Sequence, residues 1–276
     1  MNPYEQRVLK QIRAWQAEPP GWGSRVLAKP GSKVAEIVQV LVPATALRAA
    51  LHGADRLGRK LSDERSILKR AGVAELSELR RQPLEARDRL SRTVMRRALM
   101  LGGATGAVFG VVGAAGLVAD VPTLLTLAMR TIHRIGLCYG EKPAADDERR
   151  LALGIFALVS ANSAEEKALA VEALRSGSAL LDAAWRDGVE RVTERELAKD
   201  ATIYSLQNLA RAIGVNLGKR KVAGTVPVVG AAVGAAVNAW YLSDVAQAAR
   251  YTFQERWLTE CYPDLAFFTD RSAPTP

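Results

Sequence analysis

The chain has 276 residues, of which 49% are hydrophobic and 24% are charged, and its formal net charge is +9. This composition is typical of a globular protein with a sizeable core and excludes an intrinsically disordered chain. The charged N-terminal sequence lacks the apolar segment of a secretory signal peptide. The two cysteines, Cys138 and Cys261, lie far apart without metal-ligand spacing, which indicates reduced thiols in a reducing compartment.

The first expected element is a helix that begins after Asn2. Asn2 is a favourable N-cap, Pro3 suits the first helical position and Glu5 the third. Apolar residues then follow one helical face as far as Trp15, and a Pro-Pro-Gly stretch at 19–21 ends the element. Helical periodicity recurs along the chain, whereas no stretch alternates apolar and polar residues as a strand does. The sequence therefore predicts an all-α protein.

Two basic blocks hold nearly all of the excess positive charge. The first, residues 80–97, contains seven arginines against two acids, and the second is residues 219–221. Three interpretations are open: a solvated helix face whose arginines pair with neighbouring acids, attraction to anionic lipid, and nucleic-acid binding. Because no recognition motif accompanies the charge, we expect no nucleic-acid partner. The residues expected to meet lipid headgroups are Arg92, Arg96, Arg97, Lys219, Arg220 and Lys221.

Each basic block is followed by a charge-free stretch rich in glycine and alanine. Residues 98–119 and 222–243 each run for 22 residues without a charge, and at an offset of 124 residues a Gly-x-x-x-Gly pair is matched in both. Glycine costs about 1 kcal/mol in a helix relative to alanine, so we expect compensation from close backbone packing between the two stretches. The glycines expected at this contact are Gly106, Gly110, Gly113, Gly230 and Gly234.

These matched stretches predict one all-α domain over residues 1–266, a multi-helix bundle around two quasi-repeated Gly/Ala-rich apolar helical hairpins. The quasi-repeats cover about residues 80–140 and 205–262, and a flexible C-terminal tail follows at 267–276. Both stretches carry cations at their N-terminal side, and the only segment available to cross back between them is charged at its middle. We therefore expect hairpins that are buried or shallowly inserted rather than two independent membrane spans.

Three motifs carry a resemblance to a known family. They are Gly-Leu-Val-Ala-Asp-Val-Pro-Thr-Leu at 116–124, Val-Pro-Val-Val-Gly-Ala-Ala-Val-Gly at 226–234, and the helix at 248–258. On these motifs the chain resembles the EcsC family of bacterial proteins over roughly residues 3–262. The resemblance implies association with a membrane or with an ABC transporter, and it brings no catalytic residues. The polar residues of the matching motifs are Asp120, Arg130, Tyr139, Asn238 and Asp244.

Asp120 and Asp244 directly follow the two charge-free stretches. The simpler interpretation is that each aspartate caps the helix that follows it, where a carboxylate accepts backbone N–H bonds at the positive end of the helix dipole. The alternative is that they pair with Arg130 or Arg250 where the two halves meet. Proton or ion handling by these acids is a third interpretation.

No arrangement of residues points to catalysis, a metal or a cofactor. His52 and His133 are the only histidines and share no metal-ligand spacing, no Gly-x-Ser-x-Gly elbow is present, and the glycine-rich stretch lacks the Gly-Lys-Ser/Thr of a phosphate loop. We expect a non-enzymatic cytoplasmic protein, peripheral to the inner face of the cytoplasmic membrane, that binds anionic lipid and supports an ABC transporter. The alternatives are a soluble lipid- or fatty-acyl-binding protein with an internal apolar cavity, and a hydrolase with an unrecognised site.

Overall fold

The computed structural model describes residues 1–19, 53–111, 114–142, 227–264 and most of 151–176. Every regular element in these ranges is a helix, which confirms the all-α prediction. A short helical stretch at 53–60 precedes the second labelled helix. The labelled helices are α1 (Pro3–Ala17), α5 (Glu64–Ala71), α6 (Leu76–Arg81), α7 (Leu84–Val111), α8 (Ala114–Cys138), α10 (Ala164–Ser176) and α14 (Pro227–Cys261).

Helix α1 begins as its sequence predicts. Asn2 Oδ1 accepts the Glu5 N–H at 2.9 Å, and Glu5 Oε2 accepts the Asn2 N–H at 2.7 Å, so the two residues form a capping box. The helix ends at Ala17, just before the Pro-Pro-Gly stretch. Trp15 then lies against Tyr251 of α14, with 5.0 Å between the ring centroids, and this contact anchors α1 to the bundle.

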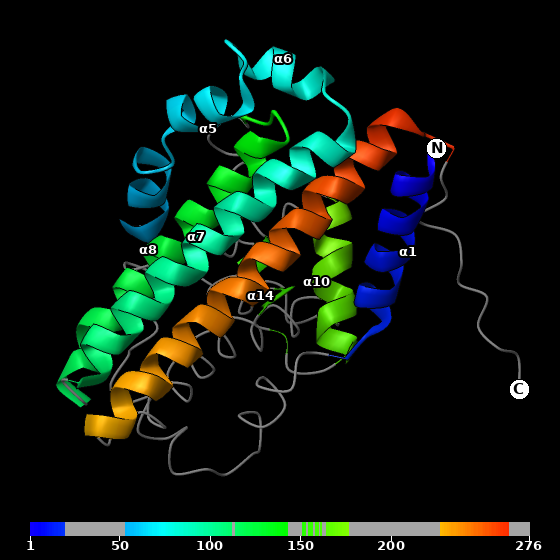
Figure 1. The fold of residues 1–276 in the computed structure, drawn as a ribbon. Coiled ribbons are helices and arrows are strands. Elements are labelled where there is room, and N and C mark those ends of the chain that lie inside the picture. Colours follow the sequence, from blue (N-terminus) through cyan, green and yellow to red (C-terminus); the bar gives the residue numbers. More distant parts are fainter. Residues whose placement is uncertain are drawn as a thin grey trace, which may run out of the picture.

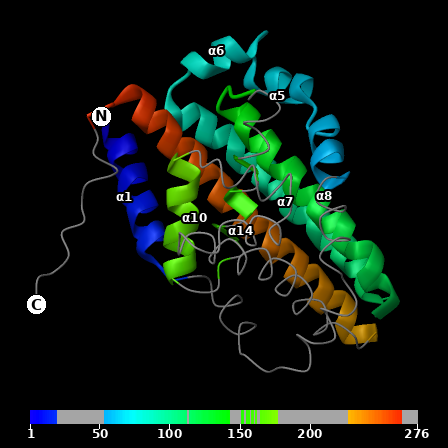
Figure 2. The same ribbon diagram turned by 180° about the vertical axis from the view of Figure 1, so that it is seen from behind.

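Three long helices, α7, α8 and α14, form the centre of the molecule (Figure 1). Helix α7 runs antiparallel to the other two, so its C-terminal end lies where α8 and α14 begin, at the lower left of Figure 1. From behind, α1 and α10 cover one side of α14, while α5 and α6 lie near the N-terminal end of α7 (Figure 2). The core between these layers includes Leu124, Leu125, Met129, Ile132, Leu242 and Phe253, each at most 2% exposed.

The first charge-free stretch is divided between two helices. Helix α7 ends at Val111 and α8 begins at Ala114, so α7 and α8 form a hairpin. The second expected hairpin is described only from Pro227, where a single helix runs to Cys261, and its first half and the tail at 267–276 lie outside the described residues. The domain limits, 1–266 for the bundle and 267–276 for the tail, stay a prediction.

Among the helices described, none has the length and apolar character needed to cross a bilayer.

Helices α7 and α14 cross with their backbones in contact. A Cβ atom added to Gly106 would lie much closer to the Gly234 carbonyl oxygen than van der Waals contact allows, and one added to Gly234 would overlap the Gly106 carbonyl oxygen in the same way. A Cβ on Gly234 would also lie 3.3 Å from the Gly110 Cα. The structure thus brings together Gly106, Gly110 and Gly234, while Gly230 lies in the first turn of α14 and Gly113 lies outside the described residues.

We expect Gly106→Ala to lower the free energy of unfolding by about 1–3 kcal/mol, because the added methyl group meets backbone that cannot move aside. Gly103→Ala is the matched control in the same helix, since the nearest neighbours of its added Cβ lie 3.9 Å away. That variant gains up to about 1 kcal/mol from helix propensity. Urea unfolding followed by far-UV circular dichroism measures both, and equal effects would contradict a backbone contact at Gly106.

Candidate functional site

A buried carboxylate, Asp88, lies where four parts of the bundle meet. It is 0% exposed and accepts three hydrogen bonds. The donors are the Tyr4 hydroxyl at 2.5 Å, the Tyr139 hydroxyl at 2.5 Å and Gln254 Nε2 at 2.7 Å. Because these donors belong to α1, to the turn after α8 and to α14, one carboxylate of α7 holds all three segments.

A buried cation lies next to this carboxylate. Arg250 is 8% exposed, and its Nε donates to Ser91 Oγ at 3.1 Å, which in turn donates to the Asp88 carbonyl at 3.0 Å. The pKa of Tyr4 is raised to about 12, mainly because the phenol is partly buried and also because it is bonded to Asp88. The pKa of Tyr139 is raised well above its usual value by burial and by the nearby charge of Asp88. Both phenols therefore remain protonated donors at neutral pH. The cluster is built to hold helices together.

Sequence analysis missed Asp88 as a central residue and counted it only as one of two acids within the basic block. The available signal was its position in the helix. Leu84, Asp88 and Ser91 are spaced four and three residues apart, so Asp88 lies on the buried face of α7 rather than among the outward arginines. Tyr139, which the sequence indicated only as a motif residue, is one of the hydrogen-bond donors to Asp88.

The expectation that Asp120 and Asp244 cap the helices that follow them is wrong. Both lie inside helices, Asp120 in α8 and Asp244 in α14. Helix α8 continues through Pro122, where the proline removes only one backbone hydrogen bond and the residues that follow, such as Leu124 and Leu125, are buried in the core. Asp120 is 1% exposed and accepts a bond from Asn238 Nδ2 at 3.0 Å, which joins α8 to α14 beside Gly106.

The arginines considered as alternative partners of these aspartates have other bonds. Arg250 donates to Ser91, as described above, and to Gln247 Oε1 at 3.4 Å. Arg130 Nε donates to the Leu61 carbonyl at 2.9 Å, on the opposite side of α8 from the core. Of the predicted motif residues, Tyr139 therefore joins the Asp88 cluster, Asp120 pairs with Asn238, and Arg130 bonds to the Leu61 carbonyl.

The outer face of α7 changes from basic to apolar along the helix. Exposed positions recur every three or four residues, which places them on one stripe. We call this surface the α7 stripe, and it consists of Glu85, Arg89, Arg92, Arg96, Met100, Ala104, Val108 and Val111. Met100, Val108 and Val111 are 75%, 64% and 57% exposed.

Three of the residues predicted to meet headgroups lie on or beside the α7 stripe. Arg92 and Arg96 belong to it, and Arg97 is exposed at its edge. Arg92 Nη2 also donates to the Tyr4 hydroxyl at 2.9 Å, so it connects the stripe to the Asp88 cluster. The second predicted block, Lys219, Arg220 and Lys221, lies outside the described residues.

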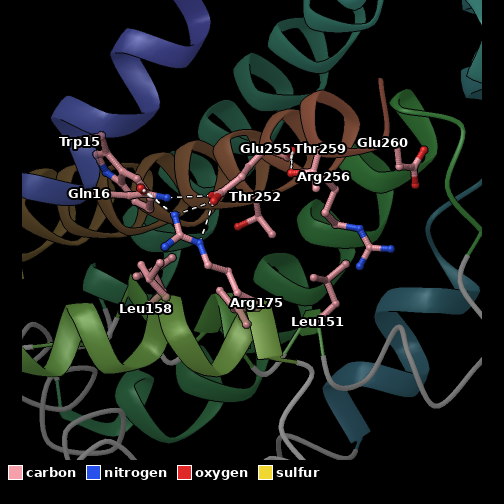
Figure 3. A pocket seen from close by; sticks show the side chains of 12 residues that line it. Trp15, Gln16, Leu151, Leu158, Arg175, Thr252, Glu255, Arg256, Thr259 and Glu260 are labelled. Atoms are coloured by element: carbon pink, nitrogen blue, oxygen red, sulfur yellow. Dashed lines mark hydrogen bonds and ion pairs between the residues drawn. The ribbon is translucent and has the colours of Figure 1, made fainter. Parts of the chain in front are cut away.

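A cavity of about 400 Å³ lies between α1, α10 and α14 (Figure 3). Leu151 and Leu158 form part of its apolar wall, and the guanidinium group of Arg175 points across it toward α1 and α14. Arg175 Nη2 lies 2.6 Å from Glu255 Oε1, and Gln16 Nε2 donates to the other carboxylate oxygen at 2.8 Å. The charges of the arginine and the glutamate are therefore already neutralised within the wall.

His133 and Cys138 occupy buried, hydrogen-bonded positions. His133 Nε2 lies 3.2 Å from Asp55 Oδ1, and the other oxygen of that carboxylate pairs with Arg59 at 2.8 Å. Burial raises the pKa of the Cys138 thiol, which donates to the Arg134 carbonyl. Within the described ranges, no group of three or more histidine, cysteine, aspartate or glutamate side chains is arranged to hold a metal ion. His52 lies outside these ranges.

These features define an all-α bundle with a glycine-packed centre, a buried carboxylate cluster and one basic-to-apolar outer face. The model of the EcsC protein family matches residues 6–258, so the chain belongs to the EcsC protein family. It is similar to an uncharacterized protein, YdbA of Bacillus subtilis (strain 168), with 24% identity over 185 residues. The match covers 67% of this chain and 63% of that protein. No solved structure matches the chain.

We expect Asp88→Asn to lower the free energy of unfolding by about 3 kcal/mol, because three hydrogen-bond donors lose their charged acceptor. Tyr139→Phe removes one of these bonds and costs about 1.5 kcal/mol. The control is Glu85→Gln in the same helix, whose side chain is 56% exposed and pairs with Arg89, and its effect stays within about 0.5 kcal/mol. Chemical denaturation ranks the three variants, and an Asp88→Asn protein as stable as Glu85→Gln contradicts a central role for the cluster.

Proposed function

We propose that this protein is a non-enzymatic peripheral membrane protein that lies on the inner face of the cytoplasmic membrane through the α7 stripe. The supporting observation is the order of side chains along that stripe, which runs from arginines to exposed apolar residues. Each arginine near an anionic membrane surface contributes about 1 kcal/mol of attraction. Exposed apolar side chains at the end of a helix favour the boundary between headgroups and acyl chains.

The geometry of the bundle is compatible with shallow insertion. A helix rises about 1.5 Å per residue, so Arg96 and Val111 are separated by about 22 Å along α7. Ala232 and Ala236 of α14 are also exposed near the same end of the bundle, where α7, α8 and α14 have their tips (Figure 1). A tilt that submerges this end by about 5–10 Å would bury Val108 and Val111 and leave the arginines at headgroup level.

The alternative of a soluble acyl-binding protein has less support. The cavity between α1, α10 and α14 is lined by two cations, Arg175 and Arg256, and Glu255 and Glu141 already pair with them. A fatty-acyl carboxylate would have to displace one of these glutamates, whereas the arginines of the α7 stripe face solvent. A role beside an ABC transporter is part of the proposal only through the family resemblance and the membrane location.

We expect the double variant Arg89→Gln/Arg96→Gln to bind vesicles containing anionic lipid about tenfold or more weakly than the wild type, because two surface cations are lost. Lys10→Gln/Arg13→Gln removes the same charge from exposed positions of α1 and serves as the control. Vesicle flotation at low and high salt measures binding, which weakens as salt screens the surface charge. Equal losses in the two double variants would show that net charge, and not the α7 stripe, controls binding.

We expect Val108→Asn/Val111→Asn to remove the part of vesicle binding that survives high salt, because apolar contact is not screened by ions. Each valine contributes on the order of 1 kcal/mol when it is partly buried in the interface. Leu57→Asn/Leu61→Asn is the matched control, since these leucines are 51% and 49% exposed and lie outside the α7 stripe. The proposal is wrong about insertion if both double variants keep the wild-type salt-resistant fraction.

A further inference from the structure

A groove of about 360 Å³ lies between the start of α5, the middle of α7 and α8. Three arginines line it: Arg97 from α7, and Arg130 and Arg134 from α8. The two α8 residues are four positions apart and therefore share one helix face. Residues more than thirty positions apart in the sequence thus converge on one concave surface.

The chain segment before α5 holds the two α8 arginines in position. Arg130 Nε donates to the Leu61 carbonyl and Arg134 Nη1 to the Ser62 carbonyl, each at 2.9 Å. This segment is itself pressed onto α8, since a Cβ on Gly58 would lie 2.8 Å from the Arg130 backbone nitrogen. A guanidinium has five N–H donors, so each arginine keeps donors for a ligand after these bonds.

Among the described residues, the positive charge of the groove exceeds its negative charge. Arg134 is only 7% exposed. Its pKa is lowered, mainly by burial and also by the neighbouring positive charge of Arg130. The acid in the groove is Asp63, whose Oδ1 accepts the Ser66 N–H as the cap of α5. In the parts of the chain that the structure describes, none of the ion pairs includes any of the three groove arginines. A buried, unpaired cation is costly, and a bound anion would relieve this cost.

The other wall of the groove is apolar and continuous with the α7 stripe. Met100 and Leu101 line it and are 75% and 42% exposed. Exposed apolar side chains beside a cationic pocket fit a ligand with an anionic head and a hydrocarbon part better than a small inorganic anion. Three arginines and one aspartate leave a charge of +2, which matches a phosphomonoester, whose charge at neutral pH is about −1.5 to −2.

We propose that the groove between α5, α7 and α8 binds the phosphomonoester headgroup of a single anionic lipid. Arg97, Arg130 and Arg134 contact the phosphate through bidentate guanidinium bonds, and Met100 and Leu101 contact the glycerol and the first part of the acyl chains. The proposal rests on the membrane association proposed above, and it adds selectivity: the α7 stripe responds to surface charge in general, whereas the groove distinguishes one headgroup.

The test compares vesicles of phosphatidylcholine that carry either phosphatidic acid or phosphatidylglycerol at equal total charge. The wild type binds the phosphatidic acid vesicles about tenfold more tightly. Arg97→Gln/Arg130→Gln loses this preference and binds the two kinds of vesicle equally. Arg89→Gln/Arg96→Gln, with the same charge loss on the stripe, weakens both kinds of binding and keeps their ratio. Circular dichroism and urea unfolding establish that both variants are folded.

The outcomes separate the two proposals. If the wild type binds neither vesicle, the membrane proposal fails. If it binds both equally, or if the groove variant keeps the wild-type ratio, only the groove proposal fails. A thermal shift measurement distinguishes a lipid from a free phosphate: lysophosphatidic acid stabilises the wild type and not the groove variant, whereas glycerol 3-phosphate stabilises neither. Equal stabilisation of the wild type by both compounds would overturn the assignment to a lipid.

Discussion

The backbone contact between Gly106 and Gly234 is the constraint on which the arrangement of the bundle depends. It sets both the separation and the register of α7 and α14, because no side chain stands between them. The register then extends along the antiparallel pair: Ser91 lies 15 residues before Gly106, Arg250 lies 16 residues after Gly234, and the two side chains are bonded. The glycine contact and the polar cluster are therefore two points on one helix interface.

The two points impose different physical demands. Glycines weaken an isolated helix by about 1 kcal/mol each, so the apolar end of α7 needs the packing against α14 in order to remain helical. At the other end, Asp88 is buried with a full set of donors, and a shift of α14 by one residue would rotate its side chains by about 100° and separate Gln254 from the carboxylate. Close packing at the glycines thus brings α7 and α14 together, and the buried carboxylate of Asp88 selects one register between the two helices.

This use of the inner face of α7 leaves its outer face available for other contacts. The arginines and the exposed apolar residues share one helix with the glycines and Asp88, so the surface proposed to meet the membrane is attached to the most constrained element of the bundle. Rigid attachment matters for the proposed groove too. The carbonyl groups before α5 and the backbone of α8 hold Arg130 and Arg134 before any ligand arrives, which reduces the entropy lost on binding.

Much of the secondary structure could be predicted from local sequence, because its causes are local. The capping box of Asn2 and Glu5, the end of α1 and the all-α class follow from neighbouring residues, and the Gly-x-x-x-Gly pairs indicated a close helix contact because glycine needs such compensation. The course of α8 through Pro122 could not be predicted in this way, because a proline inside a helical pattern ordinarily ends or kinks the helix.

The sites themselves were decided by the tertiary structure. Asp88 becomes central only because Tyr4, Tyr139 and Gln254 reach it from three distant segments. In the same way, packing of distant segments brings Asn238 to Asp120, which accepts its hydrogen bond, and places Arg97 in one groove with Arg130 and Arg134. The sequence by itself determined the helical class, the family and which residues are charged or small. The partners of each charge depended on how α7, α8 and α14 pack, because interactions between residues far apart in the sequence leave no periodic trace in a single chain.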